Sequence, residues 1–592
     1  MRKDRSVVVT GLGVIAPGSF GTEEFWNNMT QGKVFTGALR AFPHDGLRSP
    51  VSAELVESQE YVDLARRVRA AHPEEIRSKA QLLGIMGAAM ALEDGNMPTN
   101  WAEEPVHIAV GTTMGVEDSL LSDLPMDQLR DPDPEILDRH APDLILEGIR
   151  KQFALEQPTQ RMFMNACAAG NYAIGSGWDE IRSGQCDLAI TGGVDALSFL
   201  AITGFNRLLS VTPDFCRPFD KSRKGIVVAE GTAFLLLEEK EHAIRRGARI
   251  YAELSGYGLG VDAYHITSPS PDGRGAIQAM HRALEQAALA PADIDYVSAH
   301  GTGTQANDAA ECVALRQVFG DQTPPMSSIK SMIGHAMGAA SAIEAVACCL
   351  MLQHQTLLPT MNLTELDERC PIDCVPNESR GARLHHVMSN ALAFGGNTSS
   401  LIFSVHSEPG TDCTIAPASP VQSGPALAEI VSVQTFPTEG LEEYLTDNLA
   451  DYDTRAMDRQ SQLLIAAIHH TLLHNGMTVD QLPKESTAII TGSRHAALRP
   501  SLSFLCSAIE NGPLGTSPMA FPNTVGNAAA SRASILFGLR DKIICLSDGE
   551  TMSGLDALLT GIREVKKGSQ YAFPCALEED SAVIALIQRR NL

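Results

Sequence analysis

The sequence predicts an α/β fold in which parallel strands are covered by helices. Short apolar segments of strand length recur along the chain. They alternate with longer stretches of helical periodicity, among them residues 78–92, 172–183 and 341–353. This alternation is typical of strand–helix–strand units, whose strands pair in parallel and are buried on both faces. With 592 residues the chain is too long for one ordinary domain and can bury large cores.

The first element is the apolar segment Val7–Ala16, which we expect to be a buried strand. It follows a few basic residues and so imitates a signal peptide. Thr10, Gly11 and Gly13 interrupt the apolar run, however, and no clear small-residue cleavage site follows. No apolar run reaches the roughly 18 residues that a membrane helix needs. We therefore expect a cytoplasmic protein that does not bind membranes.

Charge and cysteine content exclude several classes of function. The net charge of −25 at pH 7 argues against binding nucleic acid. The twelve cysteines are scattered, and although Cys370 and Cys374 are close in sequence, no matching Cys or His pair follows. No zinc site is expected, and unpaired thiols suit a reducing compartment. We expect the acidic stretch 117–147 to be an exposed cap.

The next element contains a cysteine in the setting of a nucleophile. Cys167 follows an apolar strand that ends at Met164 and precedes a helical pattern. Free N–H groups and the positive end of the helix dipole at that position favour a thiolate. The small neighbours leave room for a thioester. A buried structural cysteine is the common alternative, because a catalytic cysteine needs histidine partners from elsewhere in the chain.

Three later segments supply such partners. His300 follows the short apolar segment 296–299 and precedes a glycine-containing turn, and His335 begins a helix rich in small residues. The segment 390–397 contains a glycine turn before another apolar strand. Each histidine by itself is more often an ordinary core or surface residue. Four such segments in this order are hard to reach by chance.

These segments resemble the β-ketoacyl-acyl-carrier-protein synthases, the condensing enzymes that include elongating type II synthases and polyketide ketosynthases. The resemblance covers residues 5 to about 405 and includes further blocks at 8–14, 217–220 and 230–233. It implies a thiolase-like α-β-α-β-α sandwich of two related halves, at residues 1–245 and 246–406. It also implies a homodimer.

The resemblance implies decarboxylative Claisen condensation of an acyl thioester with a malonyl thioester on an acyl carrier protein. Cys167 would accept the acyl chain as an acyl-enzyme. The backbone N–H groups of Cys167 and Phe394 would form the oxyanion hole. His300 and His335 would hydrogen-bond the malonyl thioester carbonyl and promote decarboxylation, which serves fatty acid or polyketide biosynthesis.

Further site residues are implied by the same resemblance. Lys330 and Glu344 match an ion pair that orients the His335 helix, the alternative being a surface lysine with an incidental glutamate. Ala393 replaces a gate glycine of the family, and its Cβ is expected to stiffen the loop. No metal or redox cofactor is expected, because the phosphopantetheine arrives on the carrier protein. Expected substrate-binding residues are Thr302 and Thr304 for the pantetheine arm, Asp308 behind His300, and Met114 and Ile226 in the acyl pocket.

An acidic chain needs a local basic patch to bind an acyl carrier protein, which is itself acidic. The sequence offers two candidate patches, and a solvated surface is an equally good interpretation of each. The first patch contains Arg66, Arg67, Arg69, Arg77 and Lys79, and the second contains Arg217, Lys221, Arg223 and Lys224.

The end of the chain repeats its beginning. Residues 407–426 have the Pro, Ser, Gly and Thr content of a linker, and a module at 427–592 follows. Matches at an offset of 381 residues are Gln81 with Gln462, Leu92 with Leu473 and Gly95 with Gly476, and matches at an offset of 384 are Gly170 with Gly554 and Gly177 with Gly561. Such self-similarity indicates a duplicated structural unit.

The module resembles a degenerate N-terminal half of a ketosynthase. Thr551 stands opposite Cys167, and the repeat ends before any counterpart of His300 or His335. We therefore expect no chemistry from the module. We expect it to pack against the first domain or its dimer partner and to serve assembly or shape the substrate tunnel, by loose analogy with chain-length factors.

Other functions fit the sequence less well. A degradative thiolase would need a second catalytic cysteine near the C-terminal glycine turn, and none lies between Cys374 and Cys413. A loading-type decarboxylase would usually replace the nucleophile. The main alternative is a non-elongating ketosynthase or a chain-length-factor-like partner subunit, which the intact Cys167, His300 and His335 argue against.

Overall fold

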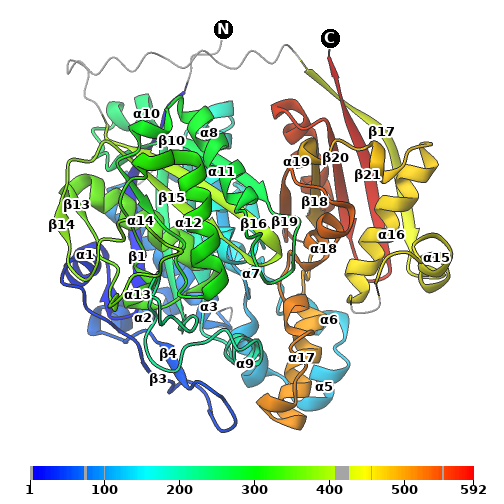
Figure 1. Cartoon of the computed structure of the whole chain (residues 1–592), viewed down its shortest axis with the longest axis horizontal. Helices are drawn as coiled ribbons and strands as arrows, with labels where there is room; N and C mark the ends of the chain where they lie inside the picture. The colour runs from blue at the N-terminus through cyan, green and yellow to red at the C-terminus, as the bar shows by residue number, and fades with distance from the viewer. Residues whose placement is uncertain are drawn as a thin grey trace.

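The computed structural model describes residues 5–72, 76–98, 101–406, 426–454, 457–549 and 553–591. Within these ranges, one sheet of sixteen strands passes through both the first domain and the C-terminal module. The first domain lies on the left of Figure 1 and the module on the right, with helices packed on the sheet in both.

The N-terminal half of the first domain contributes five long strands to the sheet. They are β1 (Val7–Ala16), β5 (Val106–Gly111), β6 (Thr159–Phe163), β7 (Leu188–Asp195) and β9 (Gly231–Glu239). Strands β7, β5 and β6 pair in parallel, and β9 lies antiparallel between β7 and β1. β1 is buried along its whole length, as its apolar sequence predicts.

Ten helices and four short strands complete this half within the described residues. The helices are α1 (Thr22–Thr30), α2 (Gln59–Ala71), α3 (Lys79–Asp94), α4 (Leu120–Asp123), α5 (Met126–Arg130), α6 (Pro134–Asp138), α7 (Leu144–Gln152), α8 (Ala169–Ser183), α9 (Phe199–Arg207) and α10 (Lys240–Arg245). The short strands are β2 (Ser19–Phe20), β3 (Gly37–Ala38), β4 (Val51–Ala53) and β8 (Val228–Ala229).

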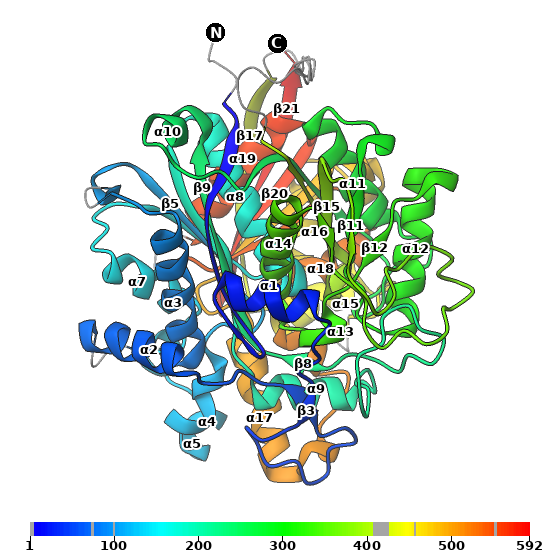
Figure 2. The ribbon, with the colours of Figure 1, turned by 90° about the vertical axis from the view of Figure 1, so that its left-hand side faces the viewer.

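The second half joins the first where β10 (Ala252–Val261) pairs antiparallel with β1. Its other strands are β11 (Tyr296–Ser298), β12 (Met326–Ser327), β13 (Thr356–Leu357), β14 (Arg380–Gly381), β15 (His386–Leu392) and β16 (Asn397–Ser404). Its helices are α11 (Arg274–Ala287), α12 (Gln305–Phe319), α13 (Lys330–Ile333) and α14 (Met337–His354). α14 is long and apolar enough to cross a membrane, but 89% of it is buried inside the protein, as befits the central helix of Figure 2.

The C-terminal module continues the sheet with five strands. They are β17 (Ala426–Pro437), β18 (Thr487–Gly492), β19 (Ile543–Leu546), β20 (Tyr571–Leu577) and β21 (Ser581–Asn591). Its helices are α15 (Leu441–Asn448), α16 (Arg459–His474), α17 (Leu498–Asn511), α18 (Ala528–Phe537) and α19 (Ser553–Lys567). The predicted linker falls almost entirely outside the described residues.

The strand order displays the repeat as a mirror image. Outward from the middle of the sheet, the first domain reads β6, β5, β7, β9, β1 and the module reads β19, β18, β20, β21, β17. β5 and β18 begin at residues 106 and 487, and α8 and α19 begin at 169 and 553, which are the offsets that the sequence predicts. The module is therefore a second N-terminal half, and the prediction of a duplicated unit is confirmed.

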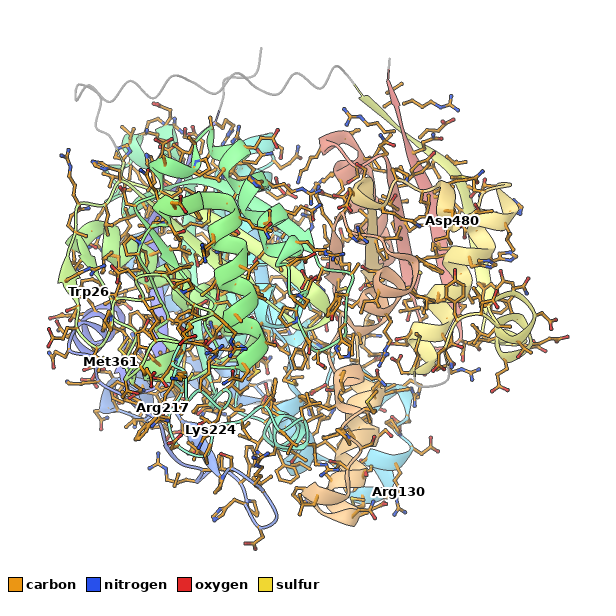
Figure 3. The ribbon with its side chains drawn as sticks, viewed as in Figure 1. Trp26, Arg130, Arg217, Lys224, Met361 and Asp480 are labelled. Carbon is orange, nitrogen blue, oxygen red and sulfur yellow. The ribbon has the colours of Figure 1, made fainter. Side chains whose placement is uncertain are left out.

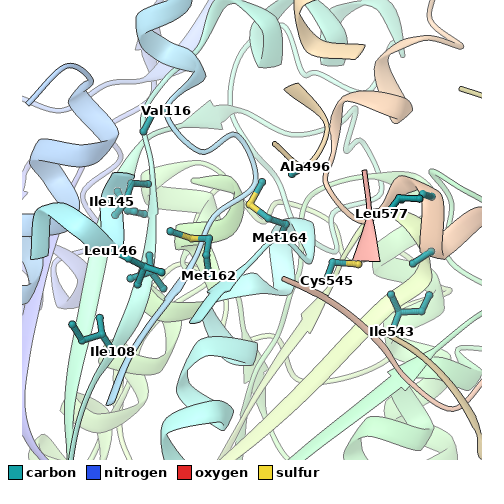
Figure 4. Packing of buried hydrophobic residues seen from close by; sticks show 14 of the residues in the cluster. Ile108, Val116, Ile145, Leu146, Met162, Met164, Ala496, Ile543, Cys545 and Leu577 are labelled. Atoms are coloured by element: carbon teal, nitrogen blue, oxygen red, sulfur yellow. The ribbon is translucent and has the colours of Figure 1, made fainter. Parts of the chain in front are cut away.

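Strands β6 and β19 join the two parts of the sheet. They are antiparallel, with Phe163 opposite Leu546. The Met164 N–H donates to Cys545 O at 2.9 Å, and the Ser547 N–H donates to Met162 O at 3.0 Å. The side chains of Met162 and Met164 lie in one apolar cluster with Cys545 (Figure 4). The module thus packs against the strand that leads to Cys167, and its predicted packing on the first domain is confirmed.

A second contact joins α17 of the module to α5 and α6, side by side at the bottom of Figure 1. Leu502 of α17 is buried in one cluster with Leu129 and Ile136, which lie within the acidic stretch 117–147. The expectation of an exposed cap therefore holds for charged residues such as Asp127 and Glu135, which are exposed, but not for the apolar residues of the stretch. Its apolar residues face the module, which a reading of its charges does not reveal.

Candidate active site

Cys167 sits in a tight turn between β6 and α8. The preceding residue, Ala166, has a φ of 48°, a left-handed conformation that costs a non-glycine residue on the order of 1–3 kcal/mol. In the first turn of α8, a Cβ on Gly170 would lie 2.8 Å from Ser341 Oγ, so α8 and α14 approach closely. The strained turn and this packing place the Cys167 thiol at the N-terminus of α8 with 7% exposure.

The two predicted histidines meet at this thiol. His335 Nε2 lies 3.1 Å from Cys167 Sγ. The ring of His300 lies edge-on to the ring of His335, with centroids 5.4 Å apart. Residues that are far apart in the sequence therefore form one cluster of a thiol and two imidazoles, as predicted.

Lys330 and Glu344 form a buried ion pair beside the histidines. The Lys330 Nζ also lies 3.4 Å from His300 Nδ1. Both charged side chains are almost completely buried, which rules out the alternative of a surface lysine with an incidental glutamate. The pair brings a positive charge close to both imidazoles without exposing it to water.

Burial dominates the protonation of the cluster. It raises the pKa of the Cys167 thiol to about 12, although the nearby Lys330 acts in the opposite direction. Desolvation of the fully buried thiol therefore opposes the thiolate that the helix N-terminus is expected to favour. Burial, and then the Lys330 charge, hold the pKa of His300 and His335 well below the ordinary value, so both imidazoles are neutral.

Two buried carboxylates that the sequence did not single out hold the catalytic loops. Glu311 accepts the backbone N–H groups of His300 and Gly301 at 2.7 and 2.9 Å. Asp195 accepts the N–H groups of Met114 and Gly338 at 2.9 and 2.6 Å. Burial raises the pKa of Glu311 to about 7 and of Asp195 to about 6. Glu311 lies 11 residues after His300, and Asp195 lies 28 residues after Cys167. Neither spacing belongs to a motif, so the sequence contains no signal that identifies these two carboxylates.

A cavity of about 340 Å³ opens onto the cluster. It is lined by Cys167, His300, His335, Thr302, Thr304, Ile226, Phe394 and Lys224, among others. Met114 and Asp308, predicted as substrate contacts, do not line it. Met114 packs in the apolar cluster that includes Ile226, and Asp308 accepts the N–H groups of Phe219 and Thr302. Asp308 thus supports the His300 loop from behind.

Phe394 closes one side of the cavity. Its ring packs against Phe205 of α9, with centroids 5.5 Å apart, and against Phe521 of the module at 6.4 Å. Ala393 has a φ of −132°, an extended conformation open to any residue, so its Cβ imposes no strain there. The N–H groups of Ala393 and Gly395 bond Asn397 O and Ile266 O, which holds the loop on both sides of Phe394.

Protein-family models match the chain in three blocks. The model for the β-ketoacyl synthase N-terminal domain matches residues 4–243 and again 440–578, and the model for the C-terminal domain matches residues 251–364. The chain belongs to the β-ketoacyl synthase family. The second N-terminal match coincides with the module and shows that it is a partial repeat of the ketosynthase.

Curated ketosynthases are similar over two thirds of the chain. A putative polyketide β-ketoacyl synthase 1 of Streptomyces cyaneus is 34% identical over 420 residues, which cover 67% of this chain and 97% of the relative. A putative mitochondrial 3-oxoacyl-[acyl-carrier-protein] synthase of Schizosaccharomyces pombe is 35% identical over 431 residues, which cover 67% and 99%.

Solved structures show the same relationship. The ishigamide ketosynthase/chain length factor is 37% identical with a TM-score of 0.63 and covers 68% of this chain and 100% of that one. A type II acyl-carrier protein in complex with its ketosynthase bound to the hexaketide is 30% identical, with a TM-score of 0.61 and coverage of 68% and 100%. The PfaC keto synthase-chain length factor matches 99% of this chain and 78% of its own at a TM-score of 0.78 and 14% identity, which shows the fold alone.

The two predicted carrier-protein patches differ in this ketosynthase. Arg66, Arg67 and Arg69 are exposed on α2, but none of them lines the cavity at Cys167. Lys224 is exposed and lies at the cavity, near Arg217 at the lower left of the molecule (Figure 3). The second patch is therefore the nearer one to the active site.

Arg223 is wrongly predicted as a carrier-protein contact. Its side chain is completely buried, pairs with Asp367 and lies 3.5 Å from Asp308. It also donates to Thr304 O at 3.0 Å. Arg223 therefore braces the loop that carries Thr302 and Thr304, while the neighbouring Lys221 and Lys224 remain exposed. A run of basic residues in the sequence does not show which member turns inward.

A larger cavity of about 630 Å³ lies between the first domain and the module. Cys167 does not line it. Many of its charged side chains neutralise one another, as Lys542 does with Glu564 and Arg282 with Asp541. We therefore place the chemistry in the smaller cavity. Thr551, the predicted counterpart of Cys167, lies outside the described residues.

Proposed function

We propose that this ketosynthase elongates a polyketide-type chain by decarboxylative condensation of an acyl thioester with malonyl-acyl carrier protein. The observation that carries the proposal is the cluster of Cys167, His300 and His335 at one cavity, with His335 Nε2 3.1 Å from the thiol. The similarity to polyketide β-ketoacyl synthases supports the substrate class.

Acyl transfer begins at the thiol. The S–H proton of Cys167 passes to His335 Nε2 as the sulfur attacks the thioester carbon, and the departing pantetheine sulfur takes the proton back. The N–H groups of Cys167 and Phe394 stabilise the oxyanion, and loss of one such donor costs about 3 kcal/mol. A neutral His335 is the form that can accept a proton, which agrees with its lowered pKa.

Condensation follows once the sulfur carries the acyl group. His300 and His335 then donate hydrogen bonds to the thioester carbonyl of the malonyl group, whose carboxylate leaves as CO₂. For this step the proton of the neutral His335 ring moves from Nδ1 to Nε2, the nitrogen that faces Cys167. The resulting enolate carbon attacks the acyl carbon of the acyl-enzyme, the C–S bond to Cys167 breaks, and the released thiolate takes up a proton from solvent to regenerate the thiol. The buried Lys330 keeps both imidazoles from taking up a second proton, so they remain neutral donors.

The carrier protein is the proposed partner for both substrates. Thr302 and Thr304 line the cavity with Oγ1 atoms 3.1 Å apart, where they would meet the pantetheine arm. Lys224 offers exposed positive charge at the cavity for an acidic carrier, while the nearby exposed Lys221 pairs with Glu365. No metal or redox cofactor enters the proposed reaction, which we place in the cytoplasm.

We propose that the module takes the place of a chain-length-factor subunit within the same chain. It pairs β19 with β6, so the edge of the first domain's sheet is already occupied. Similar solved structures are described as ketosynthases with chain length factors. The homodimer of two copies of the chain remains a prediction. A second copy would have to bind a surface other than the β6 edge, which β19 already occupies.

Intact-protein mass spectrometry tests the proposal. The enzyme is incubated with a panel of acyl carrier proteins that carry acyl chains of different length. A mass increase equal to one acyl group, mapped by peptide digestion to Cys167, followed by condensation with malonyl-acyl carrier protein, is expected. Acylation at any other residue would contradict the mechanism.

A further inference from the structure

The module reaches the active site through α18, which lies at the boundary with the first domain (Figure 1). Asn527, the residue before α18, donates a hydrogen bond from Nδ2 to the backbone oxygen of Phe394 at 2.8 Å. The Asn527 side chain is completely buried. One residue of the module therefore bonds directly to the residue that we propose for the oxyanion hole.

Ser531, one turn further along α18, contacts the same loop. Its Oγ accepts a hydrogen bond from Asn397 Nδ2 at 3.1 Å. A Cβ built on Gly395 would lie only 2.0 Å from this oxygen, and Gly395 has a φ of 79°. The loop therefore passes so close to α18 that only a glycine fits between Phe394 and Gly396.

The hydrogen bonds that begin at Ser531 continue through Asn397 to the turn that contains Cys167. Asn397 Oδ1 accepts a hydrogen bond from Asn165 Nδ2 at 3.0 Å, and Asn165 lies two residues before Cys167. Asn165 also bonds the backbone of β19, donating to Ile543 O and accepting from the Cys545 N–H, both at 3.1 Å. The module thus holds both backbone segments whose N–H groups we propose for the oxyanion hole.

Burial makes these bonds decisive for the position of the loop. Asn165, Asn397, Asn527 and Ser531 are all completely buried. A buried polar group that loses its partner costs about 1–3 kcal/mol, so movement of the Phe394 loop away from α18 is penalised several times over. The oxyanion donor at Phe394 is consequently fixed by side chains that belong to the module.

We propose that Asn527 and Ser531 are positioning residues for acyl transfer, so that the module completes the oxyanion hole of the first domain. This inference rests on the proposed roles of Cys167 and Phe394. Acyl transfer requires the Phe394 N–H, whereas decarboxylation uses His300 and His335. The two reactions should therefore respond differently when the module releases the loop.

The full-length variants Asn527→Leu and Ser531→Ala test the proposal. Leucine keeps the branched shape of asparagine but cannot donate a hydrogen bond. We expect the rate of Cys167 acylation, followed by mass spectrometry, to fall about tenfold or more. We expect malonyl decarboxylation to stay within about twofold of wild type, since the histidines are untouched. Ser531→Ala is the smaller change and provides the readout if Asn527→Leu does not fold.

Asn523→Leu is the matched control. Asn523 lies on the same module segment, is half-buried and bonds Arg532 rather than a catalytic loop, so both rates should match wild type. Wild-type acylation speed in both test variants would overturn the proposal. So would a parallel loss of acylation, decarboxylation and thermal stability, because that pattern indicates a purely structural role. Failure of the wild type to acylate at Cys167 would instead refute the proposed function.

Discussion

At the residue scale, Cys167 is a protonated thiol that depends on a neighbouring base. Its pKa of about 12 leaves essentially no thiolate at neutral pH. The neutral His335 Nε2, 3.1 Å away, is placed to take the proton only when a thioester is attacked.

Replacement of the nucleophile should separate the two half-reactions. Cys167→Ala removes the only group that forms the acyl-enzyme, so no acyl mass should appear on the protein. Decarboxylation of malonyl-acyl carrier protein should persist, because His300 and His335 are unchanged. Acylation of the mutant, seen by intact mass, would show that Cys167 is not the nucleophile.

Removal of Lys330 should change the pH dependence of acylation. Its positive charge is the second cause, after burial, that lowers the pKa of His300 and His335. In Lys330→Met both pKa values should rise toward 6.5, so His335 becomes protonated at higher pH and loses its function as a base. The acid limb of the acylation rate, measured between pH 5 and pH 8, should therefore move to higher pH.

Lys330→Met leaves the Glu344 carboxyl without its partner, which could itself alter the histidine pKa values. The double variant Lys330→Met, Glu344→Gln is the control for this effect. Burial raises the pKa of Glu344 to about 7 although Lys330 lowers it, so loss of Lys330 should raise this pKa further and leave Glu344 protonated over most of the pH range. The double variant should consequently show the same shifted limb as the single one. An unchanged limb in both would mean that burial sets the histidine pKa values without Lys330.

Single residues show both the reach and the limit of sequence-based prediction. Cys167, His300 and His335 were identifiable because each stands at a strand end or helix start within a recognisable segment. Arg223 and Met114 were misassigned, because the direction of a side chain depends on neighbours that are distant in sequence. Asn527 carries no motif at all, since its importance comes only from the loop it touches.

At the scale of elements, the short 3-10 helix Phe521–Thr524 packs the ring of Phe521 against the ring of Phe394. Phe521 is completely buried, with Phe205, Phe394 and Phe504 rings around it. A Cβ on Gly204 of α9 would lie 2.0 Å from the Phe521 ring, so the two elements are in close contact. Phe205 and Phe394 line the cavity at Cys167 whereas Phe521 does not, so the module supports the cavity wall from behind these two rings.

Truncation of this ring should widen the pocket at a cost in stability. Phe521→Ala should lower the free energy of unfolding by about 3–5 kcal/mol, the usual cost of a buried phenylalanine. Longer acyl chains should then acylate Cys167 better relative to short ones. The measurements are denaturant unfolding and a competition between carrier proteins with different chains. Phe521→Leu is the control, with smaller changes in both, and an unaltered chain preference in Phe521→Ala would show that Phe521 does not support the cavity wall.

The position of the carrier protein can be tested on two elements. Lys224→Glu, beside the cavity, should raise the apparent KM for carrier protein about fivefold, the equivalent of about 1 kcal/mol, and flatten its salt dependence. Arg67→Glu on α2 should change both less, because α2 does not line the cavity. The opposite ranking, from steady-state assays at several salt concentrations, would assign docking to α2.

At the scale of the whole molecule, repetition was the most predictable feature and assembly the least. Constant offsets identified the module as a second N-terminal half, and the mirror order of the sheet follows from it. That β19 would pair with β6 could not be read from either copy. Both strands are short, and β6 begins with the polar residues Thr159, Gln160 and Arg161 whereas β19 is apolar, so their sequences contain no signal for a partner strand.

Removal of the module should disrupt the first domain rather than merely shorten it. A chain that ends at residue 406 would expose the β6 edge together with Met162, Met164 and the apolar residues near α5. An unpaired apolar edge strand invites aggregation. We expect loss of soluble protein, or a soluble form with strongly reduced acylation at Cys167. A soluble truncated chain with wild-type acylation would show that the module is dispensable.

The joint between β6 and β19 also bears on how the enzyme is made. Separate subunits find each other only in proportion to their concentrations, and unequal synthesis leaves one in excess. Tethering two interacting units in one polypeptide keeps their local concentration on the order of millimolar however dilute the solution. Every translated copy thus carries its own counterpart in a one-to-one ratio. The turnover number of this enzyme should consequently be independent of its dilution.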